Sequence, residues 1–223
     1  MRTTSINEET VYPLPQPTFL RVFAKIISYL FHPLFIPAYL AAYVIYIHPY
    51  AFAMLDEKQK LIRWLSVFVT TAFFPAVTVF LLWRLKFASS MFLRTQKERI
   101  IPYVTSVIYF FWAFYVSKNL PGSPPVIVFL FLGIFLSTSA ALMANSYFKI
   151  SLHGLGVGGA AAYMILLSMA SMQSMGLVIA VTTIVAGLVC TSRLIISDHR
   201  PFDVYWGVII GAVSQYVAYL FII

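Results

Sequence analysis

Long apolar runs separated by short polar segments are the feature that most limits how this chain folds. Of its 223 residues, 61% are hydrophobic and only 10% are charged, whereas soluble domains carry about a quarter charged residues. The hydrocarbon core of a bilayer is about 30 Å thick, so a helix needs about 20 apolar residues to cross it. Uninterrupted apolar length predicts spans near residues 25–50, 62–85, 102–117, 124–148, 154–171, 175–193 and 204–223.

These runs predict an all-α, polytopic membrane helix bundle with six or seven transmembrane helices. The third and fifth runs are short, so either one could be tilted, broken or partly re-entrant. We expect a single membrane-embedded domain over residues 25–223. A polar arm over residues 1–24 precedes it and lacks the apolar core of a cleaved signal peptide. The small residues of 154–162 favour close helix packing.

Ionisable residues near the later spans gather in three clusters at span ends, over residues 94–99, 149–153 and 192–203. Ionisable groups at membrane depth are costly, and they are functional candidates for that reason. Two spans separate each cluster from the next. Because an even number of crossings returns the chain to the same side, all three clusters are expected at one membrane face.

The third cluster has the pattern S-R-x5-H-x3-D, formed by Ser192, Arg193, His199 and Asp203. Pro201 suits the first turn of a helix and disfavours helix at the residue before it. His199 is therefore expected in the loop before the last span, close to the positive end of that helix, which attracts phosphate. Asp203 can hold one imidazole nitrogen and leave the other as a nucleophile. Arg193 can present a planar fork to phosphoryl oxygens.

The three clusters resemble the motifs of the type 2 phosphatidate phosphatase family. They occur in the same order as in that family, over residues 97–203, which is about half of the chain. This family is the lipid-phosphatase branch of a superfamily shared with bacterial acid phosphatases and vanadium haloperoxidases. The third cluster has the spacing of the family's third motif. In the second, P-S-G-H, this chain keeps Ser151 and His153 but replaces the proline and glycine. In the first, K-x6-R-P, Lys97, Arg99 and Pro102 supply the residue types at a different spacing.

The resemblance implies a role for each matching residue. His199 would attack phosphorus and form a phosphohistidine, and Asp203 would orient it. His153 would protonate the leaving lipid alkoxide and then activate water. The phosphate-binding groups implied are Lys97, Arg99, Arg193, Ser151 and the backbone amide of Gly154. Because the first motif departs from the family spacing, Arg94 competes with two of these cations for the same roles. No metal and no cofactor are implied.

The function expected from these residues is hydrolysis of a lipid phosphomonoester or diphosphate through a phosphohistidine. The candidate substrates are phosphatidic acid, phosphatidylglycerophosphate, polyprenyl diphosphate and phosphorylated lipid A. The alternatives are a lipid phosphotransferase using the same site and a non-catalytic transporter or scaffold. Ionisable residues at span ends, rather than at mid-span, argue against a transporter.

The partners expected are the lipid substrate and the bilayer. On a membrane protein, the net charge of +8 reflects anionic headgroups and loop orientation rather than nucleic acid. The oligomeric state is left open.

Charge also predicts an orientation for a multi-pass protein of the plasma (inner) membrane. With seven spans, eleven of the fifteen lysines and arginines lie on the face that carries the motifs. Setting aside four candidate site cations still leaves seven against four, so the positive-inside rule places this face in the cytoplasm. The family resemblance favours the opposite side, because many of its lipid phosphatases work on the outer face. Two further histidines, His32 and His48, each precede a proline and are interpreted as structural or interfacial.

Overall fold

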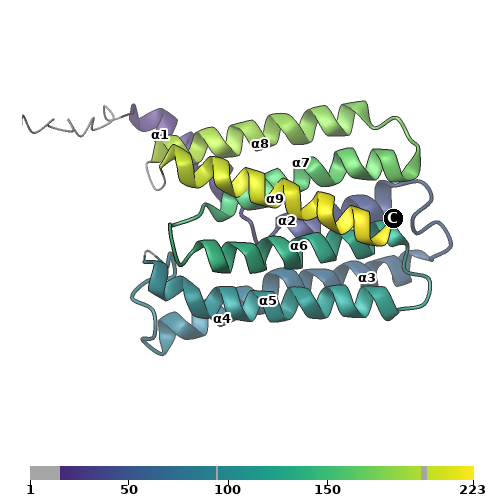
Figure 1. The fold of residues 1–223 in the computed structure, drawn as a ribbon, viewed down its shortest axis with the longest axis horizontal. Helices are drawn as coiled ribbons and strands as arrows, with labels where there is room; N and C mark the ends of the chain where they lie inside the picture. The colour runs from purple at the N-terminus through teal and green to yellow at the C-terminus, as the bar shows by residue number, and fades with distance from the viewer. Residues whose placement is uncertain (1–15, 94, 197–199) are drawn as a thin grey trace, which may run out of the picture.

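The computed structural model describes residues 16–93, 95–196 and 200–223, and the regular structure in these ranges is entirely helical. The helices lie side by side along one common direction (Figure 1). In chain order they are α1 (Thr18–Leu30), α2 (Ile36–Ala42), the π-helical turn η1 (Tyr43–Ile47), α3 (Glu57–Phe68), the π-helical turn η2 (Val69–Phe73), α4 (Phe74–Arg84), α5 (Gln96–Asn119), α6 (Pro125–Ala144), α7 (Leu152–Ser171), α8 (Gly176–Ile196) and α9 (Pro201–Ile222).

Six of these helical segments are long and apolar enough to cross a membrane. The first joins α3, η2 and α4 into one continuous helix over Glu57–Arg84, and the other five are α5 to α9. The protein is therefore a multi-pass membrane protein, and the expected all-α helix bundle is confirmed. The two runs that looked short in the sequence are regular helices, with 24 residues in α5 and 20 in α7.

The first expected span, residues 25–50, is wrong as a single helix. Helix α1 ends at Leu30, and α2 begins only at Ile36, with Pro33 in the turn between them. Proline lacks a backbone N–H and disfavours helix at the preceding residue, so the two helices are separate. Together α1, α2 and η1 still run from one end of the bundle to the other, where the loop before α3 lies (Figure 1).

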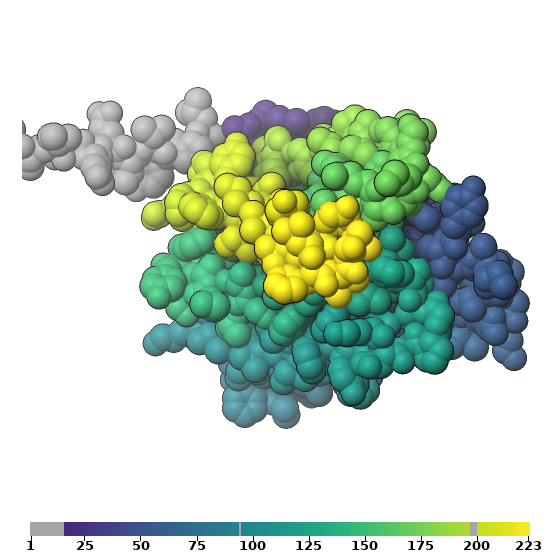
Figure 2. Space-filling model, turned by 45° about the vertical axis from the view of Figure 1, so that its right-hand side comes forward, coloured from purple at the N-terminus to yellow at the C-terminus, as the bar shows by residue number. Residues whose placement is uncertain are grey.

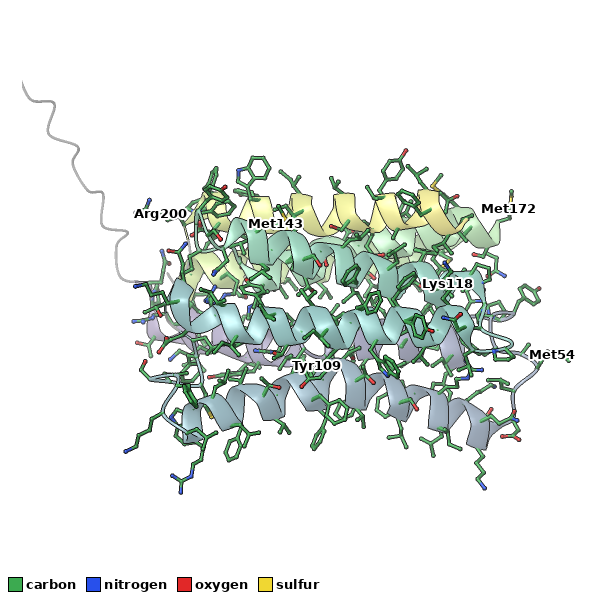
Figure 3. All side chains as sticks on the ribbon, turned by 60° about the horizontal axis from the view of Figure 1, so that its bottom comes forward. Met54, Tyr109, Lys118, Met143, Met172 and Arg200 are labelled. Atoms are coloured by element: carbon green, nitrogen blue, oxygen red, sulfur yellow. The ribbon has the colours of Figure 1, made fainter. Side chains whose placement is uncertain are left out.

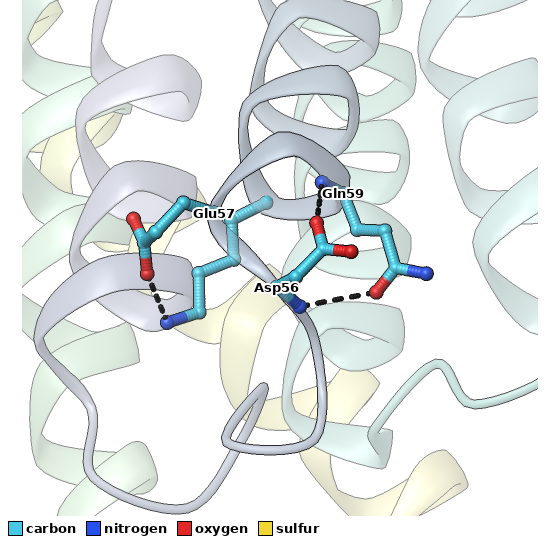
Figure 4. Close-up of polar contacts among 4 residues, drawn as sticks. Asp56, Glu57 and Gln59 are labelled. Carbon is cyan, nitrogen blue, oxygen red and sulfur yellow. Dashed lines mark hydrogen bonds and ion pairs between the residues drawn. The ribbon is translucent and has the colours of Figure 1, made fainter.

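Two helices begin earlier than apolar length predicts, because capping residues fix their first turns. At the start of α3, the Gln59 amide N–H donates to Asp56 Oδ1 (2.7 Å), and the Asp56 N–H donates to Gln59 Oε1 (3.1 Å) (Figure 4). Thr95 and Glu98 form the same reciprocal pair at the start of α5. Such capping boxes satisfy N–H groups that a helix start leaves unpaired. Helix starts therefore follow the caps rather than the onset of the apolar run.

The closest helix pair is α7 with α9, and glycines make this approach possible. A Cβ added at Gly207 would lie 2.6 Å from the carbonyl oxygen of Ser151, and one added at Gly154 would lie 2.6 Å from that of Val204. Gly158 and Gly211 face the partner backbone in the same way. Close backbone approach through small residues is a common basis of helix association in membranes, so the packing expected for this stretch is confirmed. Figure 2 shows α9, in yellow, seated over the green and teal helices.

Candidate functional site

The described parts of the three motif clusters meet at one end of the bundle. Helices α5, α7 and α9 begin there, and α6 and α8 end there (Figure 1). In Figure 3 this is the end that carries Arg200, opposite the end that carries Met54 and Met172. The described parts of the clusters thus lie at the same end, as expected from the even number of crossings between them.

Hydrogen bonds join the first cluster to the end of α6 and to the second cluster. The side-chain amide of Gln96 donates to the Asn145 carbonyl, and that of Asn145 donates to the Gln96 carbonyl, both at 2.9 Å. One turn further along α5, Arg99 donates from Nε to the Leu93 carbonyl (2.9 Å) and from Nη1 to the Ile150 carbonyl (3.2 Å). These bonds hold the Arg99 guanidinium between the loop before α5 and the segment before α7.

Backbone contacts join the second cluster to the third. The N–H of Ser151 donates to the carbonyl of Asp203 (3.1 Å). The Ser151 hydroxyl oxygen accepts from the N–H of Gly154 (3.3 Å), so this fully buried serine is the N-cap of α7. The carboxylate of Asp203 is also buried and accepts from the backbone N–H of Arg200 (3.1 Å). Ser151 and Asp203 thus fix the starts of α7 and α9 against each other.

A cavity of about 710 Å³ runs from this end into the bundle. Its mouth is basic, and farther in its walls are mostly apolar side chains of α2, α5, α6 and α7. The charged and imidazole side chains on its wall are Lys25, His32, Arg99, His153 and Arg193. The residues on its rim between α1 and the α4–α5 connection, Tyr29, Trp83 and Phe92, are exposed, so the cavity reaches the surface there.

His153 is positioned by the last turn of α1 and by the connection from α1 to α2. Its Nε2 lies 3.0 Å from the Ser28 carbonyl oxygen. Because a carbonyl oxygen only accepts, Nε2 is the nitrogen that carries hydrogen in this contact. The ring of His32 packs edge-on against that of His153, with centroids 5.4 Å apart. Two segments separated by more than 100 residues thus present an imidazole pair to the cavity.

His32 lies outside the six candidate spans and is held neutral. Burial lowers its pKa to about 4, and the positive charge of Arg193 contributes in the same direction. Because His32 is neutral, the positive charge at the cavity mouth comes from Lys25, Arg99 and Arg193. This environment suits an anion, because the described residues of the cavity wall include three cations and no carboxylate.

The structure separates the predicted site residues into two groups. Arg99, His153 and Arg193 line the cavity, whereas Lys97, Ser151, Gly154 and Asp203 do not. Lys97 is exposed on α5, and two residues apart on a helix do not share a face. Among the described residues of the first cluster, Arg99 is therefore the one that lines the cavity. The expected nucleophile His199 and the competing Arg94 lie outside the described residues.

Sequence reasoning missed the contribution of the α1 segment. Lys25 and Ser28 of α1 and His32 of the connection that follows it all line the cavity. In the sequence, their spacing of three and four residues is typical of one helix face. That spacing within an otherwise apolar stretch is the signal that could have identified them. The interpretation of residues 25–50 as one apolar span left these three polar residues out of the predicted site.

The chain matches no family model, no curated protein and no solved structure. The likeness to the phosphatase family therefore depends on the three motifs quoted above.

Proposed function

We propose that the protein hydrolyses a lipid phosphomonoester or diphosphate at this end of the bundle, through a phosphohistidine formed on His199. The observation that carries the proposal is the cavity. It brings Arg99, His153 and Arg193 from three helices to a basic mouth and continues inward between apolar walls. A lipid phosphate has the same two parts, an anionic head and an apolar tail.

The basic mouth supplies the electrostatic part of the reaction. In phosphoryl transfer, negative charge on the equatorial oxygens is stabilised by fixed positive groups, and positioning supplies much of the rest of the catalysis. Arg99 is held by hydrogen bonds to two backbone carbonyls from separate segments, so its guanidinium is preorganised. Arg193 enters from the end of α8 and lines the same cavity.

The covalent steps follow from the residue types. The imidazole of His199 forms a bond to phosphorus as the bond from phosphorus to the bridging oxygen breaks. The leaving group, which is the lipid alkoxide of a phosphomonoester or the lipid monophosphate of a diphosphate, takes a proton from His153. Water, deprotonated by His153, then displaces the imidazole and releases phosphate. Because the Nε2–H of His153 contacts the Ser28 carbonyl, the ring donates as an imidazolium, from Nδ1 while that contact is kept or from Nε2 once it opens, and becomes the neutral base for the second step. Asp203, in the first turn of α9, orients His199.

The exposed rim between α1 and the α4–α5 connection supports access from the bilayer. Tyr29, Trp83 and Phe92 line the cavity where it reaches the surface, and aromatic side chains are common at the membrane interface. A lipid moving in the membrane plane would pass its chain between these residues and bring its phosphate to the arginines.

Charge supports a cytoplasmic position for this end in the plasma (inner) membrane. The cations at the opposite end are Lys58, Lys60, Arg63 and Lys118, and the other described lysines and arginines lie toward the site end. The positive-inside rule orients the basic end to the cytoplasm.

The test is phosphate release by the purified protein in detergent from a panel of lipid phosphates and diphosphates. We expect His199→Asn to lower turnover by at least about 1,000-fold, because the nucleophile is lost. Asp203→Asn should retain more activity, because it removes only an orienting group. His48→Asn is the matched control, since His48 caps a turn at the other end of the bundle. Near-normal turnover in folded His199→Asn protein would refute the assignment.

A further inference from the structure

Three uncharged polar side chains on the cavity wall, Ser28, Tyr103 and Gln215, have a buried atom without a hydrogen-bond partner among the described residues. Gln215 of α9 lines the cavity and is only 2% exposed. Its Nε2 donates to the Leu130 carbonyl at 3.3 Å, which fixes the amide orientation because a carbonyl oxygen accepts only. Across the described ranges, Gln215 Oε1 finds no hydrogen-bond donor. Buried acceptors in native proteins are nearly always paired, so this oxygen calls for a partner.

The surrounding helices make room for this amide. A Cβ at Gly133 of α6 would collide with the Gln215 side-chain oxygen, carbon and nitrogen. On the other side, the position of a Cβ at Gly159 of α7 lies 3.8 Å from Gln215 Cγ, an ordinary contact distance. The absence of a side chain at Gly133 is therefore what lets the amide occupy its place on the cavity wall.

The position of the amide relative to the basic mouth follows from α7. Gln215 lies beside Gly159, and Gly159 is six residues beyond His153 along that helix. At 1.5 Å per residue this is a depth of about 9 Å. The inner cavity wall combines apolar side chains, among them Leu40, Phe110 and Ala160, with the hydroxyl groups of Ser106, Ser137 and Thr138. An unpaired amide oxygen on this wall favours a chain that carries a donor at its depth, because a buried polar group without a partner is costly.

We propose that the cavity takes one lipid chain into the bundle, and that Gln215 Oε1 accepts a hydrogen bond from a hydroxyl or amide N–H on that chain. The ligand class is a hydroxylated or amide-bearing amphiphile rather than a plain alkyl or isoprenyl chain. The identity of its head as a phosphate rests on the proposed function. The interior hydrogen bond rests on Gln215, Gly133 and the cavity alone.

The experiment measures binding without turnover. Hexadecylphosphonate, which is not hydrolysed, is compared with hexadecylphosphonates that carry one hydroxyl at successive chain positions, and a second series carries one secondary amide. Dissociation constants are measured for the full chain in nanodiscs. We expect one chain position, at the depth of Gln215 about 9 Å beyond His153, to improve affinity by about fivefold to tenfold, the gain of one hydrogen bond. The two series distinguish a hydroxyl donor from an amide donor.

Variants then assign the gain to the amide. Gln215→Met keeps length and apolar volume but removes the acceptor, and Gly133→Ala retains the amide but displaces it. Both should abolish the preference, while plain hexadecylphosphonate binding is retained. Ser214→Ala is the matched control, because Ser214 is buried beside Gln215 in the sequence but does not line the cavity.

Two results would overturn the proposal. One is equal affinity for every hydroxyl and amide position in the unmodified protein, as expected if the acceptor is satisfied by water alone. The other is a preference that survives both variants. If Gln215→Met does not fold, the position series and Gly133→Ala still decide. Phosphate release is measured separately with the matching alkyl phosphates, so failure of the phosphatase proposal leaves the binding result interpretable.

Discussion

Adding one methyl group at Gly207 tests the contact that joins the second and third motif clusters. In the structure, a Cβ at this position lies 2.6 Å from the Ser151 carbonyl oxygen and 3.0 Å from the Leu155 nitrogen. Both neighbours are backbone atoms, so neither can rotate away. Ordinary contact begins near 3.4 Å, which means that α7 and α9 must separate by about 0.8 Å in Gly207→Ala.

Moving the two helices apart should lower both the stability of the protein and the rate of the reaction. Overpacking of this kind typically destabilises a protein by about 1–3 kcal/mol. At about 2–4 °C per kcal/mol for a chain of this size, the melting midpoint should fall by about 2–12 °C. The same displacement moves Asp203 and its hydrogen bond from Ser151, and a misplacement of about 1 Å in a reacting group can lower a rate by about 100-fold.

The matched control is Gly187→Ala. Gly187 lies within α8, and a Cβ there meets no atom of the described residues within 4 Å. Alanine is favoured over glycine in a helix by about 1 kcal/mol, so this variant should melt at the same temperature as the unmodified protein or slightly higher. Thermal unfolding of the purified proteins in one detergent gives the stability difference, and phosphate release gives the effect on the site.

The melting data test the packing independently of the function. If Gly207→Ala has the same melting midpoint as Gly187→Ala and the unmodified protein, the close approach of α7 and α9 is refuted. If it is destabilised but retains full phosphate release, the packing stands and the link from this contact to the site fails.

Three further outcomes are expected. Arg193→Met should raise the KM for a lipid phosphate by at least about tenfold and Lys97→Met by less than about twofold, because of these two residues only Arg193 lines the cavity. The KM values are measured by kinetics in mixed micelles. A larger effect at Lys97 would place the phosphate elsewhere. EDTA should leave phosphate release unchanged and vanadate should inhibit it, whereas a strict magnesium requirement would contradict the phosphohistidine mechanism. In a Cys190→Ser background, a membrane-impermeant thiol reagent applied to intact cells should label cysteine placed at exposed Met54 but not at exposed Tyr147. Labelling at 147 alone would reverse the proposed orientation.

The spans could be predicted because apolar length is a local property, whereas their starts and the broken first segment depend on single residues. Asp56 and Thr95 each begin a helix through a capping box that lies outside the apolar run. Pro33 interrupts a run that hydropathy alone treats as continuous. Recognising the sequence Asp-x-x-Gln at 56–59 as a cap would have placed that helix start.

The candidate site divides in a similar way. The even number of spans between the clusters predicted that Arg193 and His153 would lie at one membrane face, and both line one cavity. A serine before a helix is equally suited to bind phosphate and to cap the helix. In the structure the Ser151 hydroxyl caps α7, and only the fold distinguishes the two roles. The contact of His153 with Ser28, 125 residues away, depends on tertiary packing that no local pattern contains.

The glycine contacts between α7 and α9 have a consequence for how the protein is made. Helix α9 follows α6 and α7 in the chain, yet it packs extensively against both of them. At about 5–20 residues per second, the ribosome needs roughly 3 to 10 s to proceed from the end of α7 to the end of α9. During this interval Gly154 and Gly158 face lipid or a provisional neighbour. The interval is the period in which insertion factors and membrane proteases compete for the nascent chain, and variants that weaken the α7–α9 contact should be detected first as lower yield in cells.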